Sequence, residues 1–315
     1  MKSKKLIFLL VIFIFVGAAV FFNIAASNKS MNNEISFSNV FQVVGNVTSS
    51  ANRGIGSILP IDGMDEKELG DEIKKRYRQY NYPHLEKDRT YLNSLLRNAE
   101  WAKHKKFDYE IFVEETFEAN AYALPGGAVV VTQPLLKTVK SESELMAIIA
   151  HEVGHIENSH CFNAVKFEIL TKKLNLGSLG KVADVAQNIL LRHSYSKTQE
   201  AEADDYAFEV IKNSPYDIMA VSNSFKSLLE YDGINRNAHL SILEDYFQSH
   251  PSLEQRIEKF AAKANAWKKR HPENDRYIGR ENLAEKISFL EKDFGLKERT
   301  SFIQETIQLP GQPRQ

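Results

Sequence analysis

The sequence contains a single cysteine, Cys161, in 315 residues. A lone cysteine cannot form a disulfide within the chain, so packing or a bound metal has to hold the fold together. Its thiol could act as a nucleophile, but isolated cysteines are more often small buried hydrophobic residues. We expect the second role for Cys161. An oxidising compartment is neither required nor excluded.

The chain also lacks an excess of charge of either sign. Its 40 Lys and Arg residues nearly balance its 41 Asp and Glu residues, which gives a formal net charge of -1. Nucleic-acid binding usually needs a basic patch or a basic domain, so we exclude nucleic acid as a partner. The hydrophobic fraction of 43% is that of a globular chain with a sizeable core.

A long apolar run occurs only at the N-terminus. Three lysines among the first five residues precede the run Leu6–Phe22, which approaches the ~20 residues needed to span a bilayer. Signal peptides have apolar regions of about 7 to 15 residues, and cleavage after Ala26 would place Ile24 where a small residue is preferred. We therefore predict a membrane anchor over 1–26, with a cleaved signal peptide as the alternative. The lysines should stay cytoplasmic.

Composition divides the rest of the chain into three parts. Residues 27–65, rich in Asn, Ser and Gly, are typical of a linker. Residues 66–262 have the patterning of a folded domain, and 263–315 that of a helical extension with a frayed tail. Two short strands are expected over 109–113 and 128–132, around a turn-bearing segment. Helices are expected over 66–80, 87–103, 141–156, 196–213 and 282–307, and after Tyr216 and Pro251.

An H-E-x-x-H motif lies on one of these helices. Ser141, with Glu144 three residues later, is a capping-box pattern that predicts the start of the helix. His151 and His155 are four residues apart and so share one helix face, where both imidazoles can bind one zinc ion. Glu152 lies beside them and can reach a zinc-bound water as a general base.

A second helix supplies candidates for a third ligand. Its start is predicted by Ser196 with Gln199 at the capping-box position, and Glu200 and Asp204 then lie four residues apart on one face. One carboxylate can bind the metal, and the other can accept the N–H of a ligand histidine. An acidic helix face alone is usually solvated surface. With H-E-x-x-H upstream, the metal interpretation is favoured, because catalytic zinc usually has three protein ligands.

Two further motifs complete a family pattern. Asn120-Ala121-Tyr122-Ala123-Leu124-Pro125-Gly126-Gly127 precedes the H-E-x-x-H helix, and His250-Pro251 followed by Arg256 comes after the acidic motif. Together the four motifs resemble the zinc metallopeptidase family of the CAAX prenyl endopeptidase and HtpX type, in its single-span or periplasmic branch. The resemblance implies an α+β, mainly helical zincin-like domain with a small β-sheet. It also implies one Zn2+ per chain and hydrolysis of protein or peptide substrates.

Transferred position by position, the resemblance implies a ligand set. His151, His155 and Glu200 correspond to the zinc ligands, and Glu152 to the base. Glu202, although close to Glu200 in sequence, is not the expected ligand.

Other residues are expected around the metal. Asp204 is a candidate for supporting a ligand histidine. His250 could act as a transient ligand or oxyanion stabiliser with Arg256 behind it, or both could be structural residues at a helix start. His160, five residues past His155, is expected at a helix end, off the ligand face.

The segment before Pro125 has two interpretations. Asn120, Ala121 and Tyr122 resemble the family's substrate-side edge strand, to which an extended peptide could add by main-chain hydrogen bonds. Alternatively the segment is only a turn. The chain departs from the family where Ser-Arg often precedes the acidic motif, since Ser196 is followed by Lys197.

These observations predict a membrane-anchored zinc endopeptidase in the bacterial cell envelope, acting in protein quality control. Its catalytic domain would lie on the periplasmic side of the inner membrane, or be secreted to the periplasm after signal cleavage. A zinc-bound chaperone or assembly factor with little proteolysis is the alternative. Nothing in the sequence indicates a cleavage-site preference or an oligomeric state.

Overall fold

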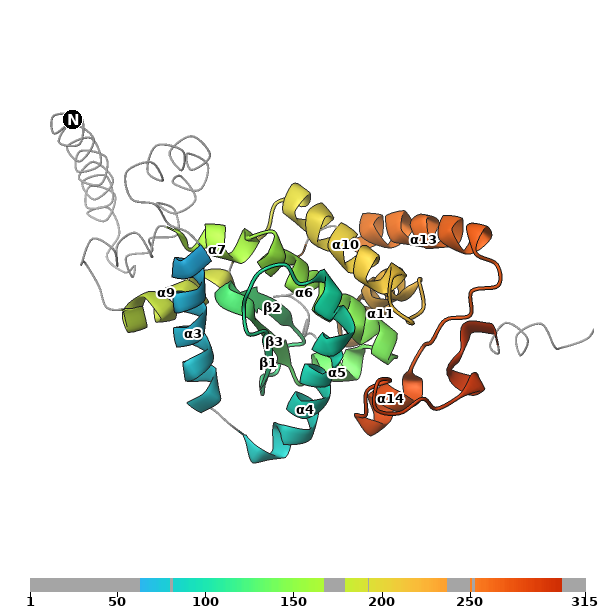
Figure 1. The fold of residues 1–315 in the computed structure, drawn as a ribbon, viewed down its shortest axis with the longest axis horizontal. Coiled ribbons are helices and arrows are strands. Elements are labelled where there is room, and N and C mark those ends of the chain that lie inside the picture. The colour runs from blue at the N-terminus through green and yellow to red at the C-terminus, as the bar shows by residue number, and fades with distance from the viewer. Residues whose placement is uncertain are drawn as a thin grey trace, which may run out of the picture. The chain divides into compact units, whose positions relative to one another are not determined.

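Three short strands form a mixed sheet with helices packed around it (Figure 1). The computed structural model describes residues 63–79, 82–166, 179–191, 193–236, 250 and 253–301. In chain order the elements are α3 (Gly63–Gln79), η1 (Pro83–Leu85), α4 (Glu86–Leu95), η2 (Leu96–Ala102), β1 (Glu110–Glu114), β2 (Ala121–Leu124), η3 (Pro125–Gly127), β3 (Ala128–Thr132), α5 (Leu135–Thr138), α6 (Glu142–Glu157), α7 (His160–Ala164), α9 (Leu179–Leu191), α10 (Lys197–Lys212), α11 (Ala220–Arg236), α13 (Leu253–Arg270), α14 (Arg280–Glu285) and η4 (Leu296–Glu298).

The strand order is β1-β3-β2, with β3 parallel to β1 and antiparallel to β2. The buried central strand β3 contains three consecutive valines, whose branched side chains fit a sheet covered on both faces. The expected α+β class with a small sheet is confirmed, and both expected strands are present. The segment expected to hold a turn also contains β2, which is an edge strand that ends at the Pro125–Gly127 turn.

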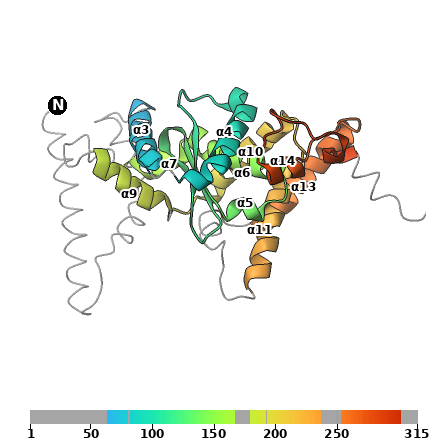
Figure 2. The same cartoon turned by 90° about the horizontal axis from the view of Figure 1, so that it is seen from below.

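No helix in the described part of the chain is long and apolar enough to cross a bilayer. The expected membrane helix over 1–26 lies outside that part, as does the linker as far as residue 62. The described residues all belong to one unit, which extends over residues 61–315. Within it, α3 and α9 pack together near one end, and α13 and α14 lie toward the other (Figures 1 and 2).

Side-chain caps fix where α6 and α10 begin. The Ser141 hydroxyl accepts the N–H of Glu144, as predicted, but the Glu144 carboxylate accepts from the Lys140 N–H rather than completing a capping box. At the start of α10 the full capping box is present, with Ser196 and Gln199 each bonding the other's backbone N–H. Both helix starts are therefore set by local sequence.

The helices α6 and α10 cross at a glycine. A Cβ atom on Gly154 would lie 3.1 Å from the Cα and the carbonyl oxygen of Ala203 and 3.1 Å from Tyr206 Cβ. Such contacts are tighter than a side chain tolerates without backbone movement. The small residues at this crossing allow the two backbones to approach closely enough for side chains from both helices to meet.

Two helix predictions differ from the structure. The stretch 87–103 is α4 followed by the 3-10 helix η2. The single helix expected over 282–307 is wrong for the described residues: α14 ends at Glu285, and Lys286 has a left-handed φ of 54°. The Asn282 amide donates to the carbonyls of Ile287 (2.8 Å) and Lys292 (2.9 Å), which folds the chain back instead of continuing the helix.

A short segment after α13, Arg276–Gly279, contacts α6 at its N-terminus. We call it the C-terminal strap. The carbonyls of Gly279 and Ile278 accept the N–H groups of Glu142 (2.9 Å) and Ser143 (3.1 Å). These belong to the first turn of α6, where backbone N–H groups have no partner within the helix. The strap therefore completes the hydrogen bonding at that helix end.

The same strap contacts α10 at its opposite end. The Arg276 guanidinium donates to the carbonyls of Ser214 and Lys212, the latter at 2.9 Å, and lies over the Trp267 ring at 4.4 Å. Carbonyls at the end of a helix lack partners within it, and a cation near them also suits the helix dipole. One segment thus holds both of the helices on which the acidic and histidine motifs lie.

We expect Arg276→Met to lower the free energy of unfolding by about 1–3 kcal/mol, because it leaves buried carbonyls without donors while keeping an apolar stem on Trp267. Arg299→Met is the matched control, since Arg299 also lies over an aromatic ring and pairs with Asp293 at the surface. The control should change stability by less than about 1 kcal/mol. Urea titration measures both, and equal losses would contradict the capping role.

Candidate metal centre

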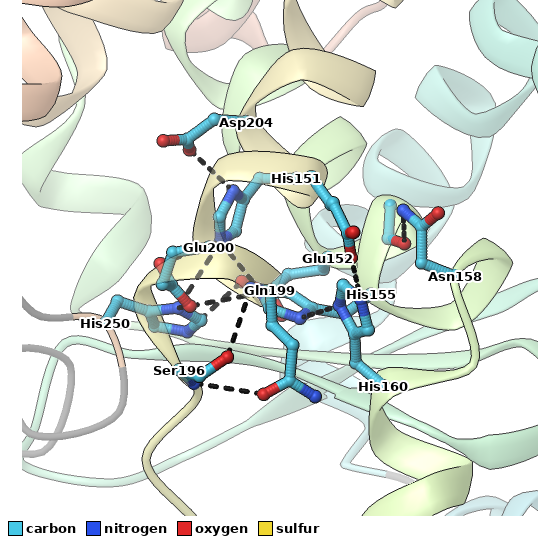
Figure 3. A network of polar contacts seen from close by, with 12 residues as sticks. His151, Glu152, His155, Asn158, His160, Ser196, Gln199, Glu200, Asp204 and His250 are labelled. Carbon is cyan, nitrogen blue, oxygen red and sulfur yellow. Dashed lines mark hydrogen bonds and ion pairs between the residues drawn. The ribbon is translucent and has the colours of Figure 1, made fainter.

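Four buried side chains converge where α6 and α10 cross. His151 and His155 extend from α6, Glu200 from the first turn of α10, and His250 from a position three residues before α13 (Figure 3). One nitrogen or oxygen atom from each lies within 4.8 Å of the others. The structure therefore brings together the three expected ligands and His250, from segments that are far apart in sequence.

The spacing of these atoms fits one tetrahedral zinc ion. Ligand atoms about 2.1 Å from such an ion lie roughly 3.4 Å from one another. The Nε2 atoms of His151 and His155 are 3.1 Å apart, and Glu200 oxygens lie 3.4 Å from His155 Nε2 and 3.6 Å from His151 Nε2. His250 Nδ1 lies 3.3 Å from His151 Nε2 and 3.0 Å from Glu200 Oε1. Imidazole nitrogens and a carboxylate oxygen are typical zinc ligands.

Asp204 contacts the Nδ1 atom of His151, opposite the nitrogen that faces the cluster. Its Oδ1 lies 3.0 Å from His151 Nδ1, on the side of the ring away from Glu200 and His250 (Figure 3). This contact places the ring proton on Nδ1 and leaves the Nε2 lone pair facing the cluster. Arg256 donates to both Asp204 oxygens, at 2.7 and 2.9 Å, in a bidentate pair. Burial raises the pKa of Asp204, but His151 and Arg256 outweigh it and lower the pKa overall.

Tyr195 and His160 contact His155 on two sides, and the sequence did not predict either contact. Tyr195 stacks on its ring with centroids 3.9 Å apart. His160 Nδ1 lies 3.0 Å from His155 Nδ1, and His160 Nε2 lies 2.9 Å from a Glu202 oxygen. His160 begins α7, so it does lie at a helix end, and neither it nor Glu202 is in the four-residue cluster. The available signal was a histidine soon after the motif, close to a predicted helix end.

Among the described residues, Glu152 is a buried carboxyl group with both oxygens lacking a hydrogen-bond partner. Its side chain is fully buried. The closest ionisable contact of its Oε1 is His250 Nε2, at 3.6 Å. Burial raises the pKa of Glu152 above its usual range, although His250 and His151 act in the opposite direction. A carboxyl group with open oxygens beside the cluster is placed to accept and return a proton.

The expected substrate segment includes β2, the edge strand of the sheet, whose residues are all buried. Asn120 is buried, and its Oδ1 has no hydrogen-bond partner among the described residues, whereas its backbone bonds Thr132 on both sides. The Tyr122 side chain points to the sheet face covered by α3, where its hydroxyl contacts Tyr77 (2.9 Å) and donates to Glu114 (2.8 Å). Because Asn120 bonds Thr132 and Tyr122 pairs with Val130, strand alternation directs the backbone groups of Tyr122 to β3 and those of Ala121 and Ala123 to the outer side of β2.

Two other sequence expectations have definite outcomes. Cys161 is fully buried, and burial raises the pKa of its thiol, so it is the small core residue we expected. Lys197, which stands where the family often has arginine, is exposed on the first turn of α10. It makes no contribution to the buried cluster.

The sequence profile of Peptidase family M48 matches residues 88–264, more than half of the chain. The chain belongs to peptidase family M48. M48 members are zinc-dependent metallopeptidases, so the family and the geometry of the cluster agree on the metal. The matched region includes all four converging residues and Glu152.

Several curated M48 proteases are similar to this chain. Mitochondrial metalloendopeptidase OMA1 of Arabidopsis thaliana is 29% identical over 161 residues, 50% of this chain and 32% of that protein. The beta-barrel assembly-enhancing protease of Escherichia coli is 26% identical over 234 residues, 67% of this chain and 45% of that protein. Metalloprotease YcaL of Escherichia coli is 25% identical over 165 residues, 48% and 59% respectively. The alignments thus span less than two thirds of each relative.

Arg256 lies between two buried carboxylates, so its removal should be costly. Its Nη1 is 2.8 Å from a Glu200 oxygen, in addition to the bidentate contact with Asp204. We expect Arg256→Leu to destabilise the fold by about 3–5 kcal/mol, since buried charges lose their partner. The matched control is Lys263→Leu, which breaks an exposed pair with Asp205 between the same two helices and should cost less than about 1 kcal/mol. Similar losses of thermal stability in both would contradict this assignment.

Proposed function

We propose that the chain is a zinc-dependent endopeptidase that hydrolyses peptide bonds in protein substrates. His151, His155 and Glu200 bind one Zn2+, and Glu152 is the general base. The observation that supports this most directly is the convergence of three ligand atoms at zinc-like spacing beside a buried carboxylate without a hydrogen-bond partner. The M48 relatives named as metalloproteases support the same chemistry.

Each residue then has a defined task. Zinc, when bound, polarises the scissile carbonyl and activates water for attack. Glu152 accepts the proton of the attacking water and returns it to the leaving amine, a role for which its raised pKa and open oxygens are suited. Asp204 keeps His151 in the tautomer that presents Nε2, and Arg256 pairs with both Asp204 and Glu200.

Catalytic zinc usually keeps one position open for water, and His250 would be close enough to a bound ion to occupy it. We propose that it is an exchangeable fourth ligand that moves aside when substrate binds. In this structure its Nε2 lies 3.6 Å from the Glu152 carboxylate. From that side it would donate a hydrogen bond to the oxyanion that develops during attack. This proposal rests on its present distances to Glu200 and His151, both within the range expected for ligands of one ion.

The substrate backbone would add to the edge strand β2 on the side away from β3. An extended peptide would gain main-chain hydrogen bonds there from Ala121 and Ala123, whose backbone groups face away from β3. The buried Asn120 Oδ1, which lacks a partner among the described residues, would accept an N–H from the peptide. Recognition of backbone rather than side chains fits a protease with a broad range of protein substrates.

The cellular setting is proposed from the sequence and the relatives. The N-terminal lysines and the apolar run Leu6–Phe22 favour an anchor over 1–26. Composition and patterning favour a linker over 27–65, the metallopeptidase domain over 66–262 and an extension over 263–315. Bacterial relatives include the beta-barrel assembly-enhancing protease and YcaL. We therefore propose an anchored protease on the periplasmic side of a bacterial inner membrane, acting in envelope protein quality control.

Two substitutions test the assignment. Glu152→Gln should retain one zinc per chain and lose casein cleavage by a factor of at least about 100, because the base is removed while the ligands remain. Glu200→Ala should lose zinc as well as activity. Elemental analysis and cleavage of labelled casein measure these outcomes, and a Glu152→Gln protein that still cuts casein would refute the role of Glu152.

The same variants distinguish a protease from a zinc-bound holding factor. If the wild type suppresses aggregation of an unfolded client without cutting it, and Glu152→Gln suppresses it equally well, the chaperone alternative holds. If the wild type cleaves the client and Glu152→Gln only binds it, the protease assignment holds.

A further inference from the structure

The two histidines of the H-E-x-x-H motif are supported in different ways on their far nitrogens. His151 Nδ1 contacts a buried carboxylate directly, Asp204 Oδ1 at 3.0 Å. His155 Nδ1 contacts a second imidazole, His160 Nδ1 at 3.0 Å. A carboxylate follows His160 in this chain of contacts, because His160 Nε2 lies 2.9 Å from Glu202 Oε2.

The position of the cluster fixes where the ring protons of His155 and His160 lie. His155 Nε2 faces Glu200 and His151 Nε2, so it has to present a lone pair if a metal is to bind there. Its ring proton is then on Nδ1 and is donated to His160 Nδ1. His160 in turn has its proton on Nε2 and donates it to Glu202, so every ring nitrogen has a partner.

The backbone between α6 and α7 holds His160 in place. Ser159 has a left-handed φ of 59°, which ends α6 and directs the next side chain back toward His155. The Lys105 ammonium bonds the Ser159 hydroxyl at 2.8 Å and the Glu66 carboxylate at 2.8 Å. Because left-handed conformations are unfavourable for serine, this turn persists only with such outside contacts.

We propose that His160 and Glu202 are positioning residues for the metal centre, which fix the ring orientation and tautomer of His155. The proposal rests on the function proposed above, in which His155 binds zinc. Without His160, the Nδ1 proton of the fully buried His155 has no acceptor, and the tautomer with Nε2 protonated, which cannot bind metal, becomes competitive. Residues that orient a ligand in this way typically change metal affinity by about 10- to 100-fold.

The first test uses Glu202, whose side chain is 53% exposed, so its substitution does not disturb the core. We expect Glu202→Leu in the full chain to weaken zinc binding about 10-fold or more, and Glu202→Gln, which keeps an acceptor oxygen, to weaken it less. Glu209→Leu is the matched control, because Glu209 lies on the same helix, is 56% exposed and pairs with Lys212. Zinc affinity is measured by competition with a chromogenic chelator, without reference to activity.

The second test changes His160 itself. His160→Asn retains an acceptor oxygen near His155 Nδ1 and should keep affinity close to that of the wild type, whereas His160→Phe fills the same space without an acceptor and should lose at least about 10-fold. The visible absorption bands of the cobalt-substituted proteins report ligand geometry and should shift in His160→Phe but not in His160→Asn. A purely structural role would affect thermal stability and leave these bands unchanged.

One further variant separates the two proposals. If His155→Ala loses zinc while His160→Phe and Glu202→Leu bind it within twofold of the wild type, the positioning role is wrong and the zinc site stands. If His155→Ala also keeps full zinc affinity, the proposed site itself is wrong, and the positioning role is overturned with it.

Discussion

The metal centre depends on the close crossing of α6 and α10 at Gly154 and Ala203. The proposed ligands lie on the two helices just N-terminal to this contact or one residue beyond it, so the distance between the backbones sets the distance between Glu200 and the histidine rings. A larger residue at Gly154 would separate the helices before it changed any ligand. In the H-E-x-x-H motif of this chain, the glycine is thus as much a determinant of ligand geometry as the histidines.

Close packing of this kind places three carboxylates in a region with little solvent. Glu152, Glu200 and Asp204 are all at most 3% exposed, and the one guanidinium among them belongs to Arg256. Buried anions without counter-charges are strongly destabilising. A divalent ion at the cluster supplies the remaining positive charge, so metal binding and stability of this core are coupled.

Local sequence rules predicted the parts of the site that lie within one helix. Spacing of four residues placed His151 and His155 on one face, and capping residues set both helix starts correctly. The rules gave less where the chain leaves the regular helix. His160 lies at a helix end and outside the four-residue cluster, as expected, but the turn at Ser159 also brings it against His155, a contact that helical spacing does not indicate. Tertiary contacts also end α14 early, through the Asn282 side chain, which no period in the sequence indicates.

The C-terminal strap lies beyond the matched region and still contacts both helices of the cluster. The M48 match ends at residue 264, within α13, yet Arg276–Gly279 supplies partners to the first turn of α6 and to the C-terminal end of α10. These helix ends lie far from the ligands, on the two rigid elements that hold them. By bonding both helices, the strap joins the start of α6 to the end of α10, so a segment outside the matched region stabilises the two elements that carry the cluster.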